Sequence, residues 1–284
     1  MKIIDGKKIS EKIKDELAKN VFDQVKKGLR HPNVAVILVG QREDSKLYVS
    51  LKEKSAKEVG IDSSLYLIDE NEDEKNIIET IQFLNQDENI DGILIQLPLP
   101  KKFNTNKILQ TISPNKDIDG FSISKDKIFF SPVMMAIKYS LEATIENLKD
   151  KKAFLFFNSD IFKTEVQDFL KKESISLSAI SSQEFNEIKK DKKRLEDLKK
   201  KIKDCKILIS AVGNPGFIDG DFLAEDMIII DIGITKLNKQ VLGDIKYSDT
   251  ENISGYITPV PGGIGPITVA CLLENVFKAF KYGK

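Results

Sequence analysis

The stretch Val34-Ala-Val-Ile-Leu-Val39 decides the fold class, because it is an unbroken apolar run that ends at Gly40. A continuous run of this length is typical of a strand that is buried on both faces, as in a parallel sheet. Residues 8–29, which precede it, place apolar side chains four apart among charges, and this spacing predicts an amphipathic helix. A helix followed by a buried strand predicts an α/β fold in which helices cover a parallel sheet.

The same alternation continues on both sides of a turn-rich segment at residues 114–132, which has no clear period. We place the junction of two domains in this segment, because 284 residues exceed the size of one ordinary core. The second half is typical of a doubly wound, dinucleotide-binding domain. The expected helices are 44–59, 76–84, 163–172, 190–201 and 266–281, and the expected strands are 64–68, 92–97, 153–157, 175–180, 206–212 and 227–232.

The charge balance argues against nucleic acid and membrane partners. Lysine and arginine number 44, as do aspartate and glutamate, so there is no excess positive charge to attract phosphate backbones or anionic lipid. The lysine-rich segment 189–206 carries apolar residues at helical spacing, and we interpret it as a solvated amphipathic helix. No apolar run approaches the roughly 20 residues that span a bilayer, and the start lacks the apolar core of a signal peptide. We therefore expect a cytoplasmic protein.

The cysteine and histidine content limits the chemistry that the chain can use. Cys205 and Cys271 lie in apolar stretches without metal-ligand spacing, so we expect buried thiols and no metal site. The single histidine, His31, lies in a loop-like sequence before Pro32, where a structural role is the simpler interpretation. Proton transfer in this chain must then rely on lysine, tyrosine, carboxylates or water.

Polar residues share one face of the predicted helix 44–59. Ser45, Tyr48 and Lys52 are three and four residues apart, so their side chains lie on the same side of the helix. This spacing alone favours an exposed tyrosine beside a solvated lysine, and a binding face is the alternative.

Gln96 strengthens the alternative, because it lies near the carboxyl end of the apolar strand 92–97. Ligands of open α/β sheets bind at the carboxyl ends of strands. A buried amide there needs partners, and a lysine ammonium is a suitable one. A glutamine that caps a loop is the other interpretation.

Two further segments are rich in turn residues. Asp117 and Asp119 lie in the first, which is either a solvated turn or a carboxylate offered to the adjacent N–H donors of a guanine-like or pterin-like ring. The second, residues 256–268, contains three prolines and three glycines. The backbone of such a loop can approach a flat ligand closely, and this loop leads into a helix N-terminus.

These motifs resemble those of the methylenetetrahydrofolate dehydrogenase/cyclohydrolase family, of the bacterial bifunctional type, nearly from end to end. The resemblance is carried by Lys2-Ile-Ile-Asp-Gly-Lys7, Tyr48-Val-x-x-Lys52, Asp91-Gly-Ile-Leu-Ile-Gln96-Leu-Pro-Leu-Pro100, Lys116-Asp-Ile-Asp-Gly-Phe121 and Ile257-Thr-Pro-Val-Pro-Gly-Gly263. It implies a three-layer α/β folate domain, residues 1–120 plus 262–284, and a Rossmann-like NAD(P)-binding domain, residues 121–261. The C-terminal helix would return to the first domain.

The resemblance also implies roles for single residues. Lys52 would be the catalytic lysine, Gln96 would hydrogen-bond to it and tune it, Tyr48 would stack on the aminobenzoyl part of folate, and Asp119 would hold the pterin. The implied residues of the folate cleft are Pro261, Gly262 and Gly263. Such an enzyme passes a hydride from 5,10-methylenetetrahydrofolate to NADP and hydrolyses the methenyl product to 10-formyltetrahydrofolate. Members of the family are commonly homodimers, and we expect the same here.

The nucleotide loop departs from the family's Gly-Arg-Ser-x-Ile-Val-Gly-x-Pro, because residues 157–165 read Phe-Asn-Ser-Asp-Ile-Phe-Lys-Thr-Glu. This sequence predicts weak or displaced NADP binding, because it lacks the glycines and the arginine of the family loop. The side chains of Phe157 and Lys163 would obstruct the usual pose, and Glu184 would lie near the 2'-phosphate position. The implied cofactor contacts are Asn158, Ser159, Gly213 and Ile234. Three functions stay open, in this order: the bifunctional enzyme, a cyclohydrolase that has lost oxidation, and a non-enzymatic folate-binding or interaction protein.

Overall fold

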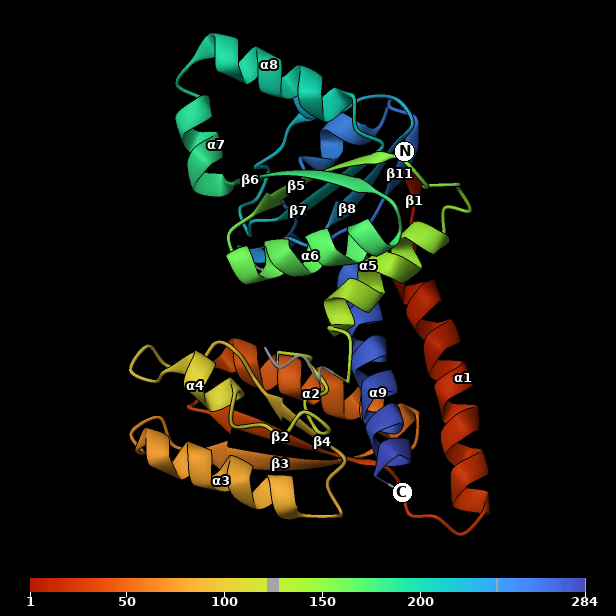
Figure 1. The fold of residues 1–284 in the computed structure, drawn as a ribbon, viewed down its shortest axis with the longest axis vertical. Helices are drawn as coiled ribbons and strands as arrows, with labels where there is room; N and C mark the ends of the chain where they lie inside the picture. Colours follow the sequence, from red (N-terminus) through yellow and green to blue (C-terminus); the bar gives the residue numbers. More distant parts are fainter. Residues whose placement is uncertain (122–127, 239, 284) are drawn as a thin grey trace. The chain divides into compact units, whose positions relative to one another are not determined.

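The computed structural model describes residues 1–121, 128–238 and 240–283, which form two compact units (Figure 1). The six-stranded unit comprises Met1–Ile9 and Ala136–Ile267, and the three-stranded unit comprises Ser10–Met135 and Thr268–Lys284. The chain passes from one unit to the other within three helices, α1 (Gly6–Lys26), α5 (Pro132–Glu142) and α9 (Ile264–Tyr282). The predicted return of the C-terminal helix to the first half of the chain is therefore confirmed.

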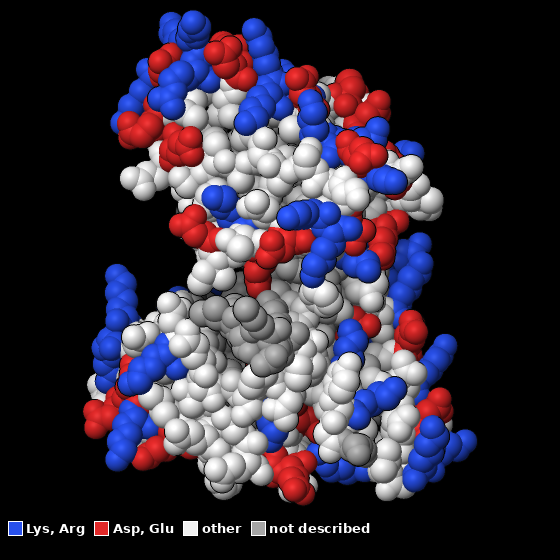
Figure 2. Space-filling view, viewed as in Figure 1, with Lys and Arg blue, Asp and Glu red and all other residues white. Residues whose placement is uncertain are grey.

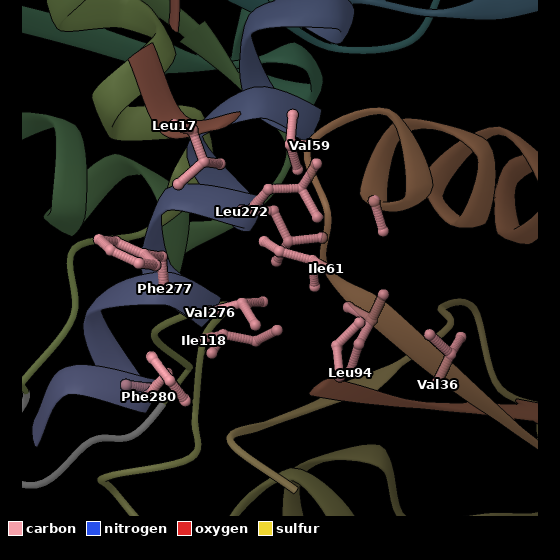
Figure 3. Packing of buried hydrophobic residues seen from close by; sticks show 14 of the residues in the cluster. Leu17, Val36, Val59, Ile61, Leu94, Ile118, Leu272, Val276, Phe277 and Phe280 are labelled. Atoms are coloured by element: carbon pink, nitrogen blue, oxygen red, sulfur yellow. The ribbon is translucent and has the colours of Figure 1, made fainter. Parts of the chain in front are cut away.

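The three-stranded unit has a parallel sheet of order β3-β2-β4 between two layers of helices. Alternate residues of the central strand face opposite sides, as the pleat requires. Val34, Val36 and Leu38 pack with α1, α2 and α9 in one core (Figure 3), and Ala35 and Ile37 pack with α3 and α4 in the other. The elements are β2 (Asn33–Val39), β3 (Asp62–Ile68), β4 (Gly92–Ile95), α2 (Glu43–Glu58), α3 (Glu74–Gln86) and α4 (Thr105–Leu109).

The six-stranded unit is doubly wound around a parallel sheet of order β1-β11-β8-β7-β5-β6. Phe154 and Phe156 pack with helices α7 and α8 on one face, and α6 covers the opposite face (Figure 1). The strands are β1 (Lys2–Ile3), β5 (Lys152–Phe157), β6 (Ser176–Ser181), β7 (Ile207–Ala211), β8 (Met227–Asp231) and β11 (Gly255–Ile257). The remaining elements are α6 (Asp160–Lys172), α7 (Ser182–Ile188), α8 (Lys192–Lys203), η1 (Gly220–Phe222), η2 (Tyr247–Thr250) and the antiparallel pair β9 (Thr235–Leu237) and β10 (Gln240–Leu242).

The predicted fold class is confirmed, and most predicted elements lie within a few residues of the observed ones. Helix α6 begins at Asp160, three residues earlier than expected, because the Ser159 side chain accepts a hydrogen bond from the Phe162 N–H and caps the helix. The predicted domain bounds at residues 120 and 262 divide the chain by function, and they stay a prediction. The two compact units change over at residues 9, 135 and 267.

Charges of both signs cover helices α7 and α8, as Figure 2 shows. Leu198 and Ile202 of α8 are buried, as predicted for an amphipathic helix whose polar face is solvated. Across residues 1–121, 128–238 and 240–283, no helix is long and apolar enough to cross a membrane.

The starts of α1 and α9 approach each other backbone to backbone, which predicts that Gly6 tolerates no side chain. A Cβ atom at Gly6 would stand 1.9 Å from the carbonyl oxygen of Gly263. We expect Gly6→Ala to lower the melting temperature by several degrees, because overpacking costs about 1–3 kcal/mol and backbone cannot rotate away. The measurement is thermal unfolding followed by circular dichroism.

Gly265→Ala is the matched control. Gly265 lies in the first turn of α9, and the space around its Cβ position is open within 4 Å of the described residues. Alanine there should leave the melting temperature unchanged or raise it slightly. Equal stability of the two variants would contradict the close backbone approach at Gly6.

Candidate active site in the three-stranded unit

Lys52 and Gln96 meet by a direct hydrogen bond. The Lys52 Nζ donates to Gln96 Oε1 at 3.0 Å, and Gln96 Nε2 donates to the carbonyl oxygen of Leu97 at 2.7 Å. The second bond fixes the orientation of the amide, so that its oxygen faces the lysine. Gln96 follows the last residue of β4, and its backbone N–H still bonds to Ile37 of β2 at 2.9 Å. The carboxyl end of the sheet thus delivers the acceptor, and helix α2 delivers the lysine.

Lys52 and Asp119 influence each other electrostatically. Burial lowers the pKa of Lys52, and the nearby Asp119 carboxylate opposes this shift. Burial raises the pKa of Asp119 to about 6, against the Lys52 charge that lowers it and together with the Asp117 charge that raises it. Desolvation is therefore the larger effect at both groups, and it favours the neutral forms.

Hydrogen bonds and close side-chain packing hold the segment that carries Asp119. The Ile93 N–H bonds to the carbonyl oxygen of Lys116 at 2.9 Å, and Lys116 Nζ donates to two carbonyl groups at the end of α3. Ile118 is fully buried against Gly92, where a Cβ would stand 2.6 Å from the isoleucine side chain. Asn275 of α9 donates to the Ile118 carbonyl oxygen at 2.8 Å. Asp119 is thus anchored immediately on its amino-terminal side.

The other predicted folate residues are divided between the two units. Tyr48 lies one helical turn before Lys52 on α2 and is 43% exposed, which leaves its ring available to a ligand. Pro261, Gly262 and Gly263 belong to the six-stranded unit, where they follow β11 and lie against the start of α1. The three-stranded unit therefore contains all three residues of the trio, Lys52, Gln96 and Asp119.

The predicted nucleotide loop of the six-stranded unit differs from expectation in one respect. Phe157 is 6% exposed, because it is the last residue of β5 and points into the core, so it does not obstruct a ligand. Asn158 donates to the Val212 carbonyl oxygen at 2.6 Å and accepts from the Ser182 hydroxyl. The loop between β5 and α6 is thus closed by side-chain hydrogen bonds to the ends of the neighbouring strands.

Two buried carboxylates were not predicted from the sequence. Asp231 ends β8 and is 3% exposed, and Asp244 is completely buried. Burial raises the pKa of Asp231 to about 7, although three backbone N–H groups stabilise its charge. The only signal for them in the sequence is a glycine close to each carboxylate, Gly233 and Gly243. No group of three or more His, Cys, Asp or Glu residues that could hold a metal ion occurs in the described part of the chain.

Family models match both halves of the chain. Residues 4–119 match "Tetrahydrofolate dehydrogenase/cyclohydrolase, catalytic domain", and residues 132–284 match "Tetrahydrofolate dehydrogenase/cyclohydrolase, NAD(P)-binding domain". The chain belongs to this family.

Individual members of the tetrahydrofolate dehydrogenase/cyclohydrolase family are similar over their full length. Bifunctional protein FolD of Pelagibacter ubique is 35% identical over 288 residues, which cover 99% of each chain. The crystal structure of the bifunctional FolD from Campylobacter jejuni superposes with a TM-score of 0.90 at 32% identity, and 99% of each chain is covered. The FolD of Trypanosoma brucei, solved with NADP and an inhibitor, gives a TM-score of 0.87 at 26% identity over 99% of this chain and 97% of that one.

The six-stranded unit fits a dinucleotide better at Gly213 than at the family's phosphate loop. Gly213 has a φ of +74°, and no described atom lies within 4 Å of its Cβ position, so a ligand can approach the backbone there. Ile234, the other predicted contact on this side, is 47% exposed. At α6, Asp160 places a carboxylate in the first turn, where an anion would bind. The one cation of residues 157–165, Lys163, lies 5.4 Å from the Phe157 ring centre.

The shifted pKa of Asp119 predicts how folate binding depends on pH. In its predicted role, the carboxylate form of Asp119 accepts two N–H donors of the pterin, and this form is lost as the pH falls through about 6. We expect the dissociation constant of a folate analogue to rise about tenfold between neutral pH and a pH one unit below that pKa, because roughly one site in ten stays ionised there. Calorimetric titration over this range measures the change.

Asp119→Asn supplies the control, because an amide does not titrate. Its binding should be weaker than that of the parent protein at neutral pH and independent of pH in the same interval. A parent protein with pH-independent affinity would contradict the assignment of Asp119 to the pterin.

Proposed function

We propose that this protein oxidises 5,10-methylenetetrahydrofolate and hydrolyses the methenyl product to 10-formyltetrahydrofolate, with Lys52 as the group that moves protons. The observation that carries the proposal is the Lys52–Gln96 hydrogen bond, with Asp119 close enough to shift the pKa of the lysine. A lysine with its ordinary pKa stays protonated at neutral pH and cannot accept a proton. Burial lowers the pKa of Lys52 and so favours the free amine, the form that can accept a proton.

Hydrolysis requires two proton movements, and Lys52 can serve both. Water attacks the methenyl carbon, a C–O bond forms, and the water loses one proton to the neutral Lys52 amine. The C–N5 bond then breaks: the protonated Lys52 returns its proton to N5, and the hydroxyl group of the intermediate loses its remaining proton to solvent as its oxygen becomes the formyl carbonyl. One proton is released overall. Gln96 holds the Lys52 Nζ in place through its fixed amide oxygen during both movements.

The folate contacts follow from the chemistry of the exposed groups. Asp119 in its ionised form accepts the adjacent N–H donors of a pterin ring, and Tyr48 presents an aromatic face to the aminobenzoyl group. Pro261, Gly262 and Gly263 stay predictions as folate contacts, since they belong to the six-stranded unit.

The dehydrogenase step requires NAD(P), which accepts the hydride when it is bound. Gly213 and Ile234 are the residues we assign to the nicotinamide side, and Asn158 and Ser159 those beside the phosphates. Asn158 and Ser159 already bond within the protein, so they contribute little to binding.

A second candidate function is a cyclohydrolase without oxidation. It is favoured by one observation, the Asp160 carboxylate at the start of α6 in place of the family's glycine-rich loop. We further propose a homodimer in the cytoplasm, on the basis of family membership.

Lys52→Met tests the assignment of the base. The variant keeps an unbranched apolar side chain only one atom shorter than that of lysine, so the fold should persist, but it cannot carry a proton. We expect methenyl hydrolysis to fall by about 10²–10⁴-fold, the usual contribution of a general acid or base. The assay follows loss of the methenyl chromophore, corrected for spontaneous hydrolysis.

Lys54→Met is the control on the same helix, because Lys54 is exposed and two residues away. It should hydrolyse the substrate at the parental rate. Parental turnover by Lys52→Met would end the assignment.

Coenzyme binding distinguishes the two candidate functions. NADPH and NADH are titrated by fluorescence, and oxidation with NADP and with NAD is assayed beside methenyl hydrolysis. We expect weak NADPH binding, because residues 157–165 lack an arginine and Asp160 repels phosphate. Asp160→Asn should strengthen binding by about two- to fivefold, the factor that corresponds to a charge at a helix end.

Asp168→Asn, an exposed aspartate in the same helix but away from its start, should leave coenzyme binding unchanged. Hydrolysis without oxidation by either coenzyme would favour the monofunctional enzyme. Rapid oxidation at micromolar NADP would contradict the prediction of weak binding.

A further inference from the structure

Asp244 holds the backbone on both sides of Gly213. Its Oδ2 accepts from the Val212 N–H at 2.7 Å and from the Ser210 hydroxyl at 2.7 Å, and its Oδ1 accepts from the Asn214 N–H at 2.8 Å. A carboxylate has acceptors only, so the position of this one side chain sets the positions of both N–H groups. Gly213 lies between them, with its backbone open to a ligand.

Asp231 in turn holds Asp244 and the second predicted coenzyme segment. Its Oδ1 accepts from the Asp244 N–H at 3.1 Å and from the Gly233 N–H at 3.0 Å, and its Oδ2 accepts from the Ile245 N–H at 2.9 Å. Ile234 follows Gly233 directly. The two carboxylates therefore connect the loops after β7 and β8 into one hydrogen-bonded network.

Glycines next to the carboxylates make this arrangement possible. A Cβ at Gly233 would stand 2.1 Å from Asp244 Oδ1, and a Cβ at Gly243 would stand 2.1 Å from Asp231 Oδ2. Asp244 thus packs against Gly233, which lies two residues after Asp231, and Asp231 packs against Gly243, which directly precedes Asp244. No larger residue fits at either position.

We propose that Asp244, held by Asp231, is a positioning residue for the coenzyme, which fixes residues 212–214 and 233–234 in the conformation that binds NAD(P). The proposal rests on the dehydrogenase function proposed above. Burial of two carboxylates is unfavourable unless hydrogen bonds compensate it, and apolar side chains would pack the interior with less loss of solvation. The hydrogen bonds of the two carboxylates go to loops that have exposed residues and lie at the carboxyl edge of a parallel sheet, where ligands bind.

Asp244→Asn is the direct test. Both oxygens of Asp244 accept from a backbone N–H, so an amide in either orientation sets its NH₂ group against one of these donors. We expect at least tenfold weaker binding of NADH and NADPH in a fluorescence titration. Methenyl hydrolysis measured without coenzyme should stay within twofold of the parent, because Lys52, Gln96 and Asp119 lie in the three-stranded unit. A general structural defect would lower both quantities.

Two further variants complete the experiment. Asp249→Asn is the control, because the Asp249 carboxylate also accepts a hydrogen bond from a backbone N–H, that of Gly220, at 3.0 Å. Gly220 lies in η1, which precedes β8, and the coenzyme affinity of this variant should not change. Thr235→Val removes a single hydrogen bond between uncharged groups, which Thr235 Oγ1 donates to the Gly213 carbonyl oxygen at 2.9 Å. This variant should weaken coenzyme binding about threefold.

The outcomes separate this inference from the proposed function. Coenzyme binding by the parent protein and unchanged binding by Asp244→Asn would overturn the inference and leave the dehydrogenase intact. If Asp244→Asn does not fold, Thr235→Val decides: weaker binding supports the inference, and parental affinity overturns it. Failure of the parent protein to bind either coenzyme would overturn the dehydrogenase proposal and this inference with it.

Discussion

Parallel strand pairing is the constraint on which both units depend. Each strand of the two larger sheets runs in the same direction as its neighbours, so the chain must return through a crossover, and all carboxyl ends emerge at one edge of each sheet. In the three-stranded unit this edge presents Gln96 after β4. In the six-stranded unit it presents Asn158 after β5 and Asp231 at the end of β8. The placement of Gln96, Asn158 and Asp231 follows from strand direction before any side chain is considered.

Strand direction places the groups, and loss of water gives them their chemistry. Burial lowers the pKa of Lys52 and raises that of Asp119, while the attraction between their charges opposes both shifts. Since desolvation is the larger effect, both groups titrate closer to neutral pH than they would in water. Lys52 and Asp119 are the pair to which the proposed function assigns proton transfer and pterin binding. In the proposed function, the position of Asp119, held through Ile118 and Asn275, affects both the pKa of Lys52 and the binding of the pterin.

Periodicity in the sequence predicted the parts of the fold that depend on repeated local patterns. The apolar run at 34–39 and the four-residue spacing at 8–29 correspond to β2 and α1, and a glutamine at a strand end predicted the partner of Lys52. Strands β1 and β11, with two and three residues, are too short to show a period. The Asp231 and Asp244 network was not predicted either, because it depends on backbone N–H groups up to 32 residues away. Such contacts are set by the tertiary fold, and the neighbouring glycines are their only signal in the sequence.

The altered nucleotide loop changes which loops of the six-stranded unit are open to a coenzyme. Asn158 bonds to Val212, and Ser159 caps α6, so side chains occupy the edge that a glycine-rich turn would leave open to a pyrophosphate. The Asn158 bond and the Asp244 bond both end at Val212, one on its carbonyl oxygen and one on its N–H. The substitution that closes the phosphate side therefore also tethers the loop of Gly213. In the proposed dehydrogenase, a coenzyme would therefore depend on the loops that the buried carboxylates hold more than on the turn between β5 and α6.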